Sequence, residues 1–222
     1  MMNDSLVQHY LADALANFRE YKKLAEKAFE QTSDEEFFLS LDAEANSIAV
    51  IIKHIAGNML SRWTDFLTTD GEKPDRNRDM EFVMTPETSR DDLLKHWERG
   101  WACLFAALEP LTPEDFSRKV LIRGEEHSVI EAITRQLTHY SYHIGQIVFL
   151  SKHFRSQEWK SLSIPRNRST EFNSYLTEKA AEGAERLSRF DAPQDFITRS
   201  QETEDRRQEE KQNSGARIQK PE

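Results

Sequence analysis

The sequence predicts an all-α fold, a four-helix bundle, followed by a polar C-terminal tail. Four long segments carry apolar residues at helical spacing, and the connections between them are short enough for a bundle. Glycine and proline number only 7 each among 222 residues, which disfavours β-sandwiches and other folds that need many turns. Hydrophobic residues make up 37% of the chain, which is enough for one core.

The first helix is predicted from about Ser5 to Gln31. Apolar residues recur in it at helix-like spacing between lysines and glutamates, namely Leu11, Leu15, Phe18, Leu24 and Phe29. Ser33, with Glu36 three positions further on, then forms the pattern of a capping box. This pattern predicts that a short helical turn follows the first helix.

The second helix is predicted from about Ala43 to Leu67. It carries a strong core-facing stripe, made of Ile48, Ile51, Ile52, Ile55, Met59 and Trp63. Gly71 and Pro74 end this pattern and lie in a charged loop over residues 70–79.

The third helix is predicted to begin after Ser89, a good N-cap residue, and to stop at Pro110. Its core stripe consists of Leu93, Leu94, Trp97, Trp101, Leu104, Phe105 and Leu108. Thr112 followed by Pro113 predicts another short helical turn. Residues 116–123 are expected to be extended or irregular.

The fourth helix is predicted from about Ser128 to Phe154, and it opens with a second capping box, Ser128 with Glu131. After Pro165 the chain is polar, and Ala216 and Ile218 are the only aliphatic residues from Arg199 to Glu222. Such a tail cannot bury enough apolar surface to offset the entropy lost on ordering. We therefore expect a bundle domain over residues 1–190 and a charged, disordered tail over residues 191–222.

Charge and cysteine content exclude several classes of protein. With 39 acidic and 30 basic side chains the net charge is −9, which argues against a nucleic-acid partner because phosphate binding needs a basic field. The single cysteine, Cys103, excludes an internal disulfide. The N-terminus lacks the apolar stretch of a signal peptide, and no window reaches the ~18 apolar residues of a membrane span. We therefore expect a cytoplasmic protein that binds neither nucleic acid nor a membrane.

His139 and His143 are the most informative residues of the sequence. They lie four positions apart on the predicted fourth helix, so both rings project from one face and can reach one metal ion. His54, which borders the isoleucine stripe of the second helix, is the best candidate for a third ligand. Three protein ligands with an open position for water or substrate are typical of catalytic zinc sites.

Other interpretations of these residues stay open. A histidine at the edge of an apolar face is often a hydrogen-bonded structural residue, and a pair four apart also arises by chance. His96 on the third helix is either a fourth ligand, an outer partner of the ligands or part of a close-packed helix face. Lys160, Arg166 and Arg168 form a local cationic cluster, which is either a solvated loop or a contact for an anionic substrate. The sequence contains no glycine-rich phosphate loop, nucleophile elbow or CxxC motif.

Two strings resemble a known family. Residues 138–147, Thr-His-Tyr-Ser-Tyr-His-Ile-Gly-Gln-Ile, resemble the H-x-x-x-H-x-G-Q signature of DinB-like (YfiT-like) metal-binding four-helix bundles, and residues 52–58 resemble the family's upstream histidine element. Residues 58–67, 70–73 and 161–165 resemble an uncharacterised bacterial branch of this superfamily, a domain of unknown function. The resemblance covers about Leu11 to Tyr175. Asn167 stands where that branch usually has glycine, and asparagine also tolerates a left-handed backbone.

The resemblance implies an up-down-down-up bundle that forms a homodimer and holds a divalent metal ion, zinc or nickel, through His54, His139 and His143. Characterised relatives include S-transferases that use low-molecular-weight thiols such as bacillithiol, and a mycothiol-dependent maleylpyruvate isomerase. In these enzymes the metal is taken to bind and activate the thiol.

The function expected from the residues and the resemblance together is that of a metal-dependent thiol S-transferase. Its partners would be a low-molecular-weight thiol and an electrophilic small molecule. Asn58 and Gln146 are the candidates for orienting the substrate or the metal ligands, and no further catalytic residue is assigned. The alternative is a non-catalytic metal-binding or dimeric interaction module.

Overall fold

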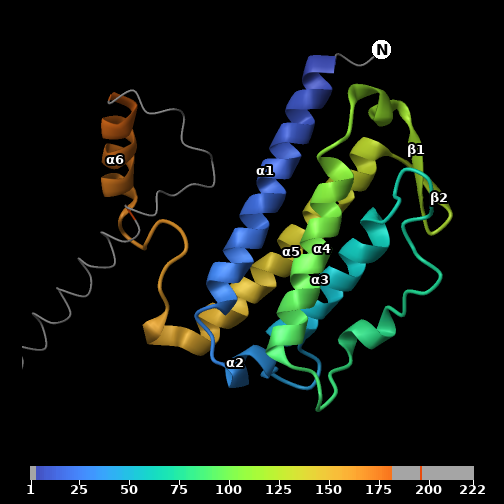
Figure 1. Ribbon diagram of the computed structural model, residues 1–222. Coiled ribbons are helices and arrows are strands. Elements are labelled where there is room, and N and C mark those ends of the chain that lie inside the picture. Colours follow the sequence, from blue (N-terminus) through green and yellow to red (C-terminus); the bar gives the residue numbers. More distant parts are fainter. Residues whose placement is uncertain (1–3, 182–195, 197–222) are drawn as a thin grey trace, which may run out of the picture. The chain divides into compact units, whose positions relative to one another are not determined.

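The computed structural model describes residues 4–181 and residue 196, and this part of the chain is mostly helical (Figure 1). Its α-helices are α1 (Asp4–Phe29), α2 (Asp34–Phe38), α3 (Ile48–Trp63), α4 (Arg90–Leu108), α5 (Val129–Arg155) and α6 (Ser169–Ala181). Its strands are β1 (Lys119–Ile122) and β2 (Glu125–Ser128). Three short 3-10 helices lie in the connections, η1 (Asp79–Phe82), η2 (Pro113–Ser117) and η3 (Ser156–Glu158). The predicted all-α fold is confirmed.

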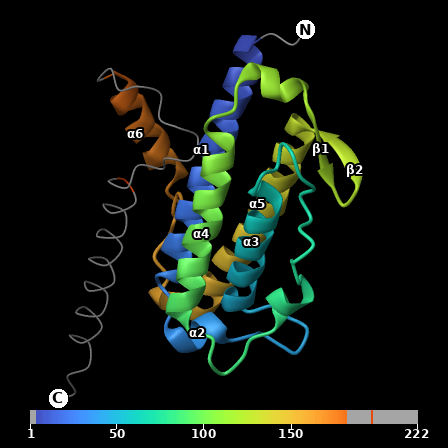
Figure 2. The same cartoon turned by 45° about the vertical axis from the view of Figure 1, so that its right-hand side comes forward.

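The bundle consists of α1, α3, α4 and α5, in which α1 and α5 run in one direction and α3 and α4 in the opposite direction, an up-down-down-up arrangement (Figures 1 and 2). Because α1 and α5 run in the same direction, Tyr10 near the start of α1 meets Thr134 near the start of α5, with their hydroxyl oxygens 2.7 Å apart. The helices α3 and α4 run together in the opposite direction. Only the connection between α3 and α4, residues 64–89, therefore crosses from one end of the bundle to the other.

Serine side chains cap four helices, as the sequence predicts for three of them. Each accepts a hydrogen bond from the backbone N–H three residues on, and the four caps are Ser33, Ser47, Ser89 and Ser128. Both predicted capping boxes are present. The apolar pattern alone predicts that this helix begins at about Ala43. It begins at Ile48 because Ser47 caps it.

Aromatic rings fill the centre of the bundle. Phe18 of α1 is completely buried, and its ring centroid lies 5.9 Å from that of Tyr140 and 6.4 Å from those of Trp63 and Trp101. Such pairs add about 0.5–1.5 kcal/mol each beyond the burial of their area. The Tyr140 hydroxyl accepts a hydrogen bond from Trp63 Nε1 at 3.2 Å and donates one to Asn58 Oδ1 at 3.1 Å. These two bonds fix the register of α5 against α3.

The extended stretch expected within residues 116–123 is confirmed for residues 119–122, whereas residues 116 and 117 belong to η2. Residues 119–122 form β1, which pairs antiparallel with β2 across a two-residue turn, Arg123-Gly124. Both turn residues have positive φ, 57° and 76°, as a type I′ turn requires. The Asp70 carboxylate accepts hydrogen bonds from both turn N–H groups at 2.8 and 2.7 Å, which ties the hairpin to the loop after α3. The sequence did not predict β2 because its residues, Glu-Glu-His-Ser, include no apolar side chain.

The bundle belongs to a compact unit that ends at Gln157, and a second unit begins at Glu158. In the second unit, the rings of Phe172 and Tyr175 on α6 contact Phe196, with centroids 5.1 and 5.6 Å away. Asn167 has a φ of 63°, so the left-handed backbone expected there is confirmed. The predicted boundary at residue 190 and the tail over residues 191–222 lie outside the described residues, apart from Phe196. Within residues 4–181, no helix is both long and apolar enough to cross a membrane.

Gly100 allows α4 to approach α3 closely. A Cβ atom at Gly100 would lie 3.0 Å from the Ala56 Cα and 3.2 Å from the Ala56 carbonyl oxygen. We predict that Gly100→Val lowers the free energy of unfolding by about 1–3 kcal/mol, because the α3 backbone must shift. Gly145→Val on α5 is the matched control, since nothing lies within 4 Å of a Cβ there.

The control is expected to change the free energy of unfolding by no more than about 0.5 kcal/mol. Urea denaturation followed by circular dichroism measures both variants. Equal effects of the two substitutions would contradict the close approach of α4 to α3.

Candidate metal centre

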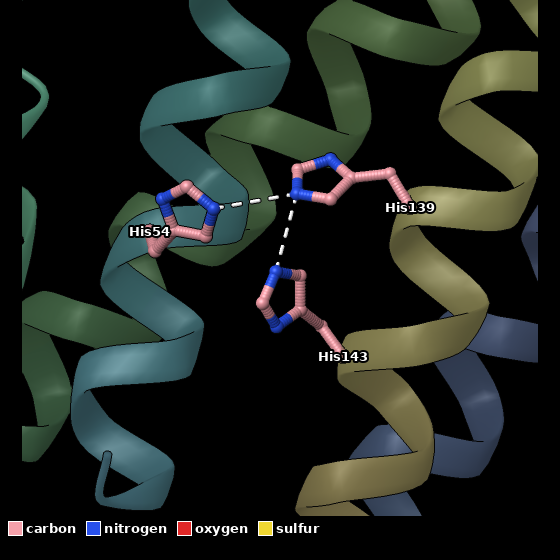
Figure 3. Close-up of side chains that lie close together, drawn as sticks. All are labelled: His54, His139 and His143. Carbon is pink, nitrogen blue, oxygen red and sulfur yellow. Dashed lines mark hydrogen bonds between the residues drawn. The ribbon is translucent and has the colours of Figure 1, made fainter. Parts of the chain in front are cut away.

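Three histidines from two helices meet between α3 and α5 (Figure 3). His54 Nε2 lies 3.3 Å from His139 Nε2, and His143 Nε2 lies 3.1 Å from the same nitrogen. His54 and His143 are buried and His139 is half-buried. Within the described part of the chain, these residues form the one group of histidines, cysteines and carboxylates close enough together to hold a metal ion.

Helix geometry explains how the sequence brings these rings together. His139 and His143 are one turn apart on α5, so both rings point toward α3 (Figure 3). His54 faces them from α3, which runs antiparallel to α5 (Figure 1). Tyr140 lies between His139 and His143 in the chain. Its hydroxyl donates a hydrogen bond to Asn58, which is one turn after His54 on α3. The register that Tyr140 sets is therefore the register that places His54 opposite the pair.

Each histidine has an oxygen atom beside its other ring nitrogen. His54 Nδ1 lies 2.8 Å from Glu81 Oε2, His143 Nδ1 lies 2.8 Å from Gln146 Oε1, and His139 Nδ1 lies 3.3 Å from Gln136 Oε1. A neutral imidazole carries one proton, and an oxygen acceptor at Nδ1 holds that proton there. The Nε2 atom of each ring is then left with a lone pair directed at the other two rings.

The donor set fits a divalent metal ion. Lone pairs that converge in this way repel one another, and a cation among them converts the repulsion into coordination. In a tetrahedral zinc site, bonds of about 2.0–2.1 Å place neighbouring nitrogens about 3.3 Å apart. The separations of His139 Nε2 from the other two Nε2 atoms, 3.3 and 3.1 Å, agree with that value, and the three ligand atoms all lie within 4.8 Å of one another. Imidazole also suits nickel, copper and iron.

Glu81 of η1 is the outer partner that orients His54. Its buried carboxylate is held by Arg76, with Nε 2.8 Å from Oε1 and Nη2 3.0 Å from Oε2. Burial disfavours its charged form, but hydrogen bonds from His54 and Arg76 outweigh burial and lower the pKa of Glu81. Gly57 makes room for it, since a Cβ there would lie 2.6 Å from Glu81 Oε1.

The electrostatic surroundings keep two of the rings neutral at pH 7. Burial, followed by repulsion from His143 and His54, lowers the pKa of His139 to about 3. Burial is also the main cause that lowers the pKa of His143, with smaller contributions from His54 and Arg78, while the hydrogen bond to Gln146 opposes the shift. Neutral rings are the state in which histidine binds a metal.

A cavity of about 440 Å³ adjoins the histidines. His54 and His139 line it, together with Asn58, Gln136 and Tyr142. This volume is typical of a site for a small molecule. The histidine cluster is therefore within reach of a ligand and is not sealed in the core.

The structure assigns contacts to the other residues that the sequence singled out. Asn58 is buried, lines the cavity and accepts a hydrogen bond from Tyr140. Gln146 contacts His143 and not the cavity. His96 is not part of the histidine cluster. Lys160, Arg166 and Arg168 belong to the second unit.

Sequence reasoning missed Glu81 and the role of Gln136. Glu81 lies in a loop 27 residues after His54, so no helical periodicity connects the two residues. Gln136 lies three residues before His139, and Gln146 lies three residues after His143, so helical spacing places both glutamines on the face that carries the histidines. This spacing was the signal available in the sequence.

Residues 5–168 match a protein family described only as a protein of unknown function, DUF1572. The match spans 164 of the 222 residues. The chain belongs to the DUF1572 family. The region matched to DUF1572 contains the whole bundle and all three histidines, but the description states no activity. Among curated proteins, no match to the chain was found.

Gly57 provides a way to disturb the metal centre without touching a ligand. We predict that Gly57→Ala displaces the Glu81 carboxylate from His54 and weakens zinc binding by about 10–100-fold, the usual effect of losing an outer partner. Glu81→Gln should act in the same direction. Competition with a zinc chelator measures the affinity.

Gly145→Ala is the matched control, because it is also a glycine-to-alanine change within a helix and its Cβ would have no neighbour within 4 Å. Unchanged zinc affinity in both Gly57→Ala and Glu81→Gln would show that Glu81 does not support the centre.

Proposed function

We propose that this protein is a DinB-like enzyme that holds a divalent metal ion, zinc or nickel, and transfers a low-molecular-weight thiol to an electrophilic small molecule. The metal ligands in this proposal are His54, His139 and His143. The observation that carries it is the convergence of three Nε2 atoms whose Nδ1 partners are all oxygens. The H-x-x-x-H-x-G-Q pattern of α5 supports the superfamily and the reaction class by analogy.

The number of ligands favours catalysis over a purely structural role. Structural zinc sites use four protein ligands, whereas catalytic sites use three and leave a position for water or substrate. The cluster supplies three histidines, and the adjoining cavity gives access to two of them. A divalent ion bound there would lower the pKa of a bound thiol or water and supply a thiolate or hydroxide near neutral pH.

The chain's own residues would orient the reactants. Glu81, Gln136 and Gln146 hold the three rings through Nδ1. Asn58 accepts a hydrogen bond from Tyr140 through Oδ1, which orients its amide group at the cavity. The Asn58 amide N–H groups are then donors available to a substrate. Gln146 contacts His143 Nδ1, so in this proposal it positions a metal ligand.

The proposed reaction is a nucleophilic substitution. The thiol sulfur forms a bond to the electrophilic carbon, and the bond between that carbon and its leaving group breaks. The leaving group takes the electron pair, and the thiol proton goes to solvent. No oxidant or reductant is needed.

Metal content tests the first part of the proposal. Untagged protein, produced with zinc and nickel supplementation and measured by plasma mass spectrometry, is expected to contain about one metal ion per chain. His139→Ala/His143→Ala should lose it, because one ligand cannot hold the ion. His153→Ala, an exposed histidine further along α5, is the control and should retain it. Absence of metal from the wild-type protein would overturn the proposal.

Thiol transfer tests the second part. We expect chloride release from 1-chloro-2,4-dinitrobenzene with bacillithiol or L-cysteine as the thiol, a loss of at least about tenfold after chelation, and recovery with zinc. His54→Ala should abolish the metal-dependent rate, and His153→Ala should not. If the protein binds metal but transfers a thiol to none of a panel of electrophiles, the transferase proposal is wrong and the alternative, a metal-binding interaction module, is favoured.

Light scattering on the same samples tests the expected homodimer.

A further inference from the structure

The cavity beside the histidines is lined by positive charge. Five of its side chains are arginines, Arg62, Arg76, Arg78, Arg123 and Arg135. Among the described residues, neither an aspartate nor a glutamate lines it. In a chain whose net charge is −9, the cavity is thus a local positive field.

These arginines come from four separate parts of the bundle unit. Arg62 lies on α3, Arg76 and Arg78 lie in the connection between α3 and α4, Arg123 lies in the hairpin turn and Arg135 lies on α5. The hairpin lies at the end of the bundle where α3 ends and α5 begins (Figures 1 and 2). Gathering like charges from distant segments opposes folding unless an anion compensates them.

The neighbouring carboxylates compensate these charges only in part. Glu72 accepts from Arg62 at 3.0 Å, from Arg76 at 3.2 Å and from Arg123 at 3.3 Å, so one carboxylate serves three guanidinium groups. Glu81 pairs again with Arg76. Arg78 has an exposed partner, Asp79, at 3.9 Å, and Arg135 has no ion-pair partner among the described residues, so three carboxylates pair with four of the five arginines.

Arg62 is buried, and its hydrogen bonding is incomplete. Its side chain is only 6% exposed, and its Nε atom is buried without a hydrogen-bond partner in the described structure. Burial lowers the pKa of Arg62, and Glu72 opposes the shift only in part. A buried guanidinium with an unsatisfied donor is poorly compensated, and further negative charge nearby would stabilise it.

Arg123 occupies a backbone position that does not suit an arginine. Its φ of 57° is left-handed, and the first position of a type I′ turn favours asparagine, aspartate or glycine. The Asp70 carboxylate holds the turn in place through two backbone N–H groups. The turn thus places the Arg123 side chain in the lining of the cavity.

We propose that the arginines bind the anionic end of the substrate, which is a small molecule carrying a carboxylate or phosphate group. Guanidinium groups bind such oxyanions through paired N–H donors. Because His54 and His139 line the same cavity, one ligand can contact the arginines and reach the histidines. This inference rests on the proposed function and defines it further: the thiol or the electrophile is an anion.

Calorimetric titration of metal-free, chelator-treated protein tests this inference. The probes are succinate for a carboxylate and inorganic phosphate for a phosphate. We expect at least one to bind in 0.15 M salt, and Arg123→Asn and Arg135→Gln to weaken its binding about tenfold each. Asparagine suits the turn at position 123, so that variant retains the fold. Arg99→Gln, an exposed arginine of α4 outside the cavity, is the charge-matched control and should bind as the wild type does.

Tighter binding of succinate identifies a carboxylate, and tighter binding of phosphate identifies a phosphate. Binding of neither probe, or equal losses in Arg99→Gln and the cavity variants, would overturn the inference. The His139→Ala/His143→Ala protein separates this result from the metal proposal, since the probe should still bind to it. Metal binding without probe binding refutes only the anion site, and probe binding without metal refutes only the metal centre.

Discussion

The packing of α5 against α3 in one register is the constraint on which the site depends. Tyr140 is completely buried, and its hydroxyl bonds both Trp63 and Asn58 on α3. A buried hydroxyl without partners is costly, so a shift of one helix along the other would leave three polar groups unsatisfied. His139 precedes Tyr140 in the chain and His143 lies three residues after it. The hydrogen bonds that satisfy the core therefore also determine where the three imidazoles meet.

Around this centre, the connection between α3 and α4 supplies what the helices cannot. Glu81 reaches His54 from η1, and Arg76 holds Glu81 in place. Gly57 leaves the space that the carboxylate occupies. The same connection carries Asp70, which anchors the hairpin, and Glu72, which binds three arginines of the cavity. The bundle helices thus provide the three histidines, whereas the loop orients the His54 ring and holds the charged side chains beside it.

Much of the bundle could be predicted from local patterns. Helical periodicity and serine caps are properties of neighbouring residues, so they revealed the four long helices and the pair His139 and His143. The positions of Glu81, Glu72 and Arg123 could not be derived in this way, because they depend on how a long loop and a hairpin fold back on the helices. The strand β2 was missed for a related reason. It has no apolar pattern of its own, and it is held by its pairing with β1 and by the hydrogen bonds of Asp70 to the hairpin turn.

X-ray absorption at the zinc edge of zinc-loaded protein tests the three-histidine centre, because it reports the number and kind of ligands. We predict three imidazole nitrogens at about 2.0–2.1 Å and one further light ligand that is not histidine. On addition of a low-molecular-weight thiol, that light ligand should be replaced by sulfur at about 2.3 Å. A first shell with fewer than three imidazoles, or one closed by a fourth protein ligand, would contradict this prediction.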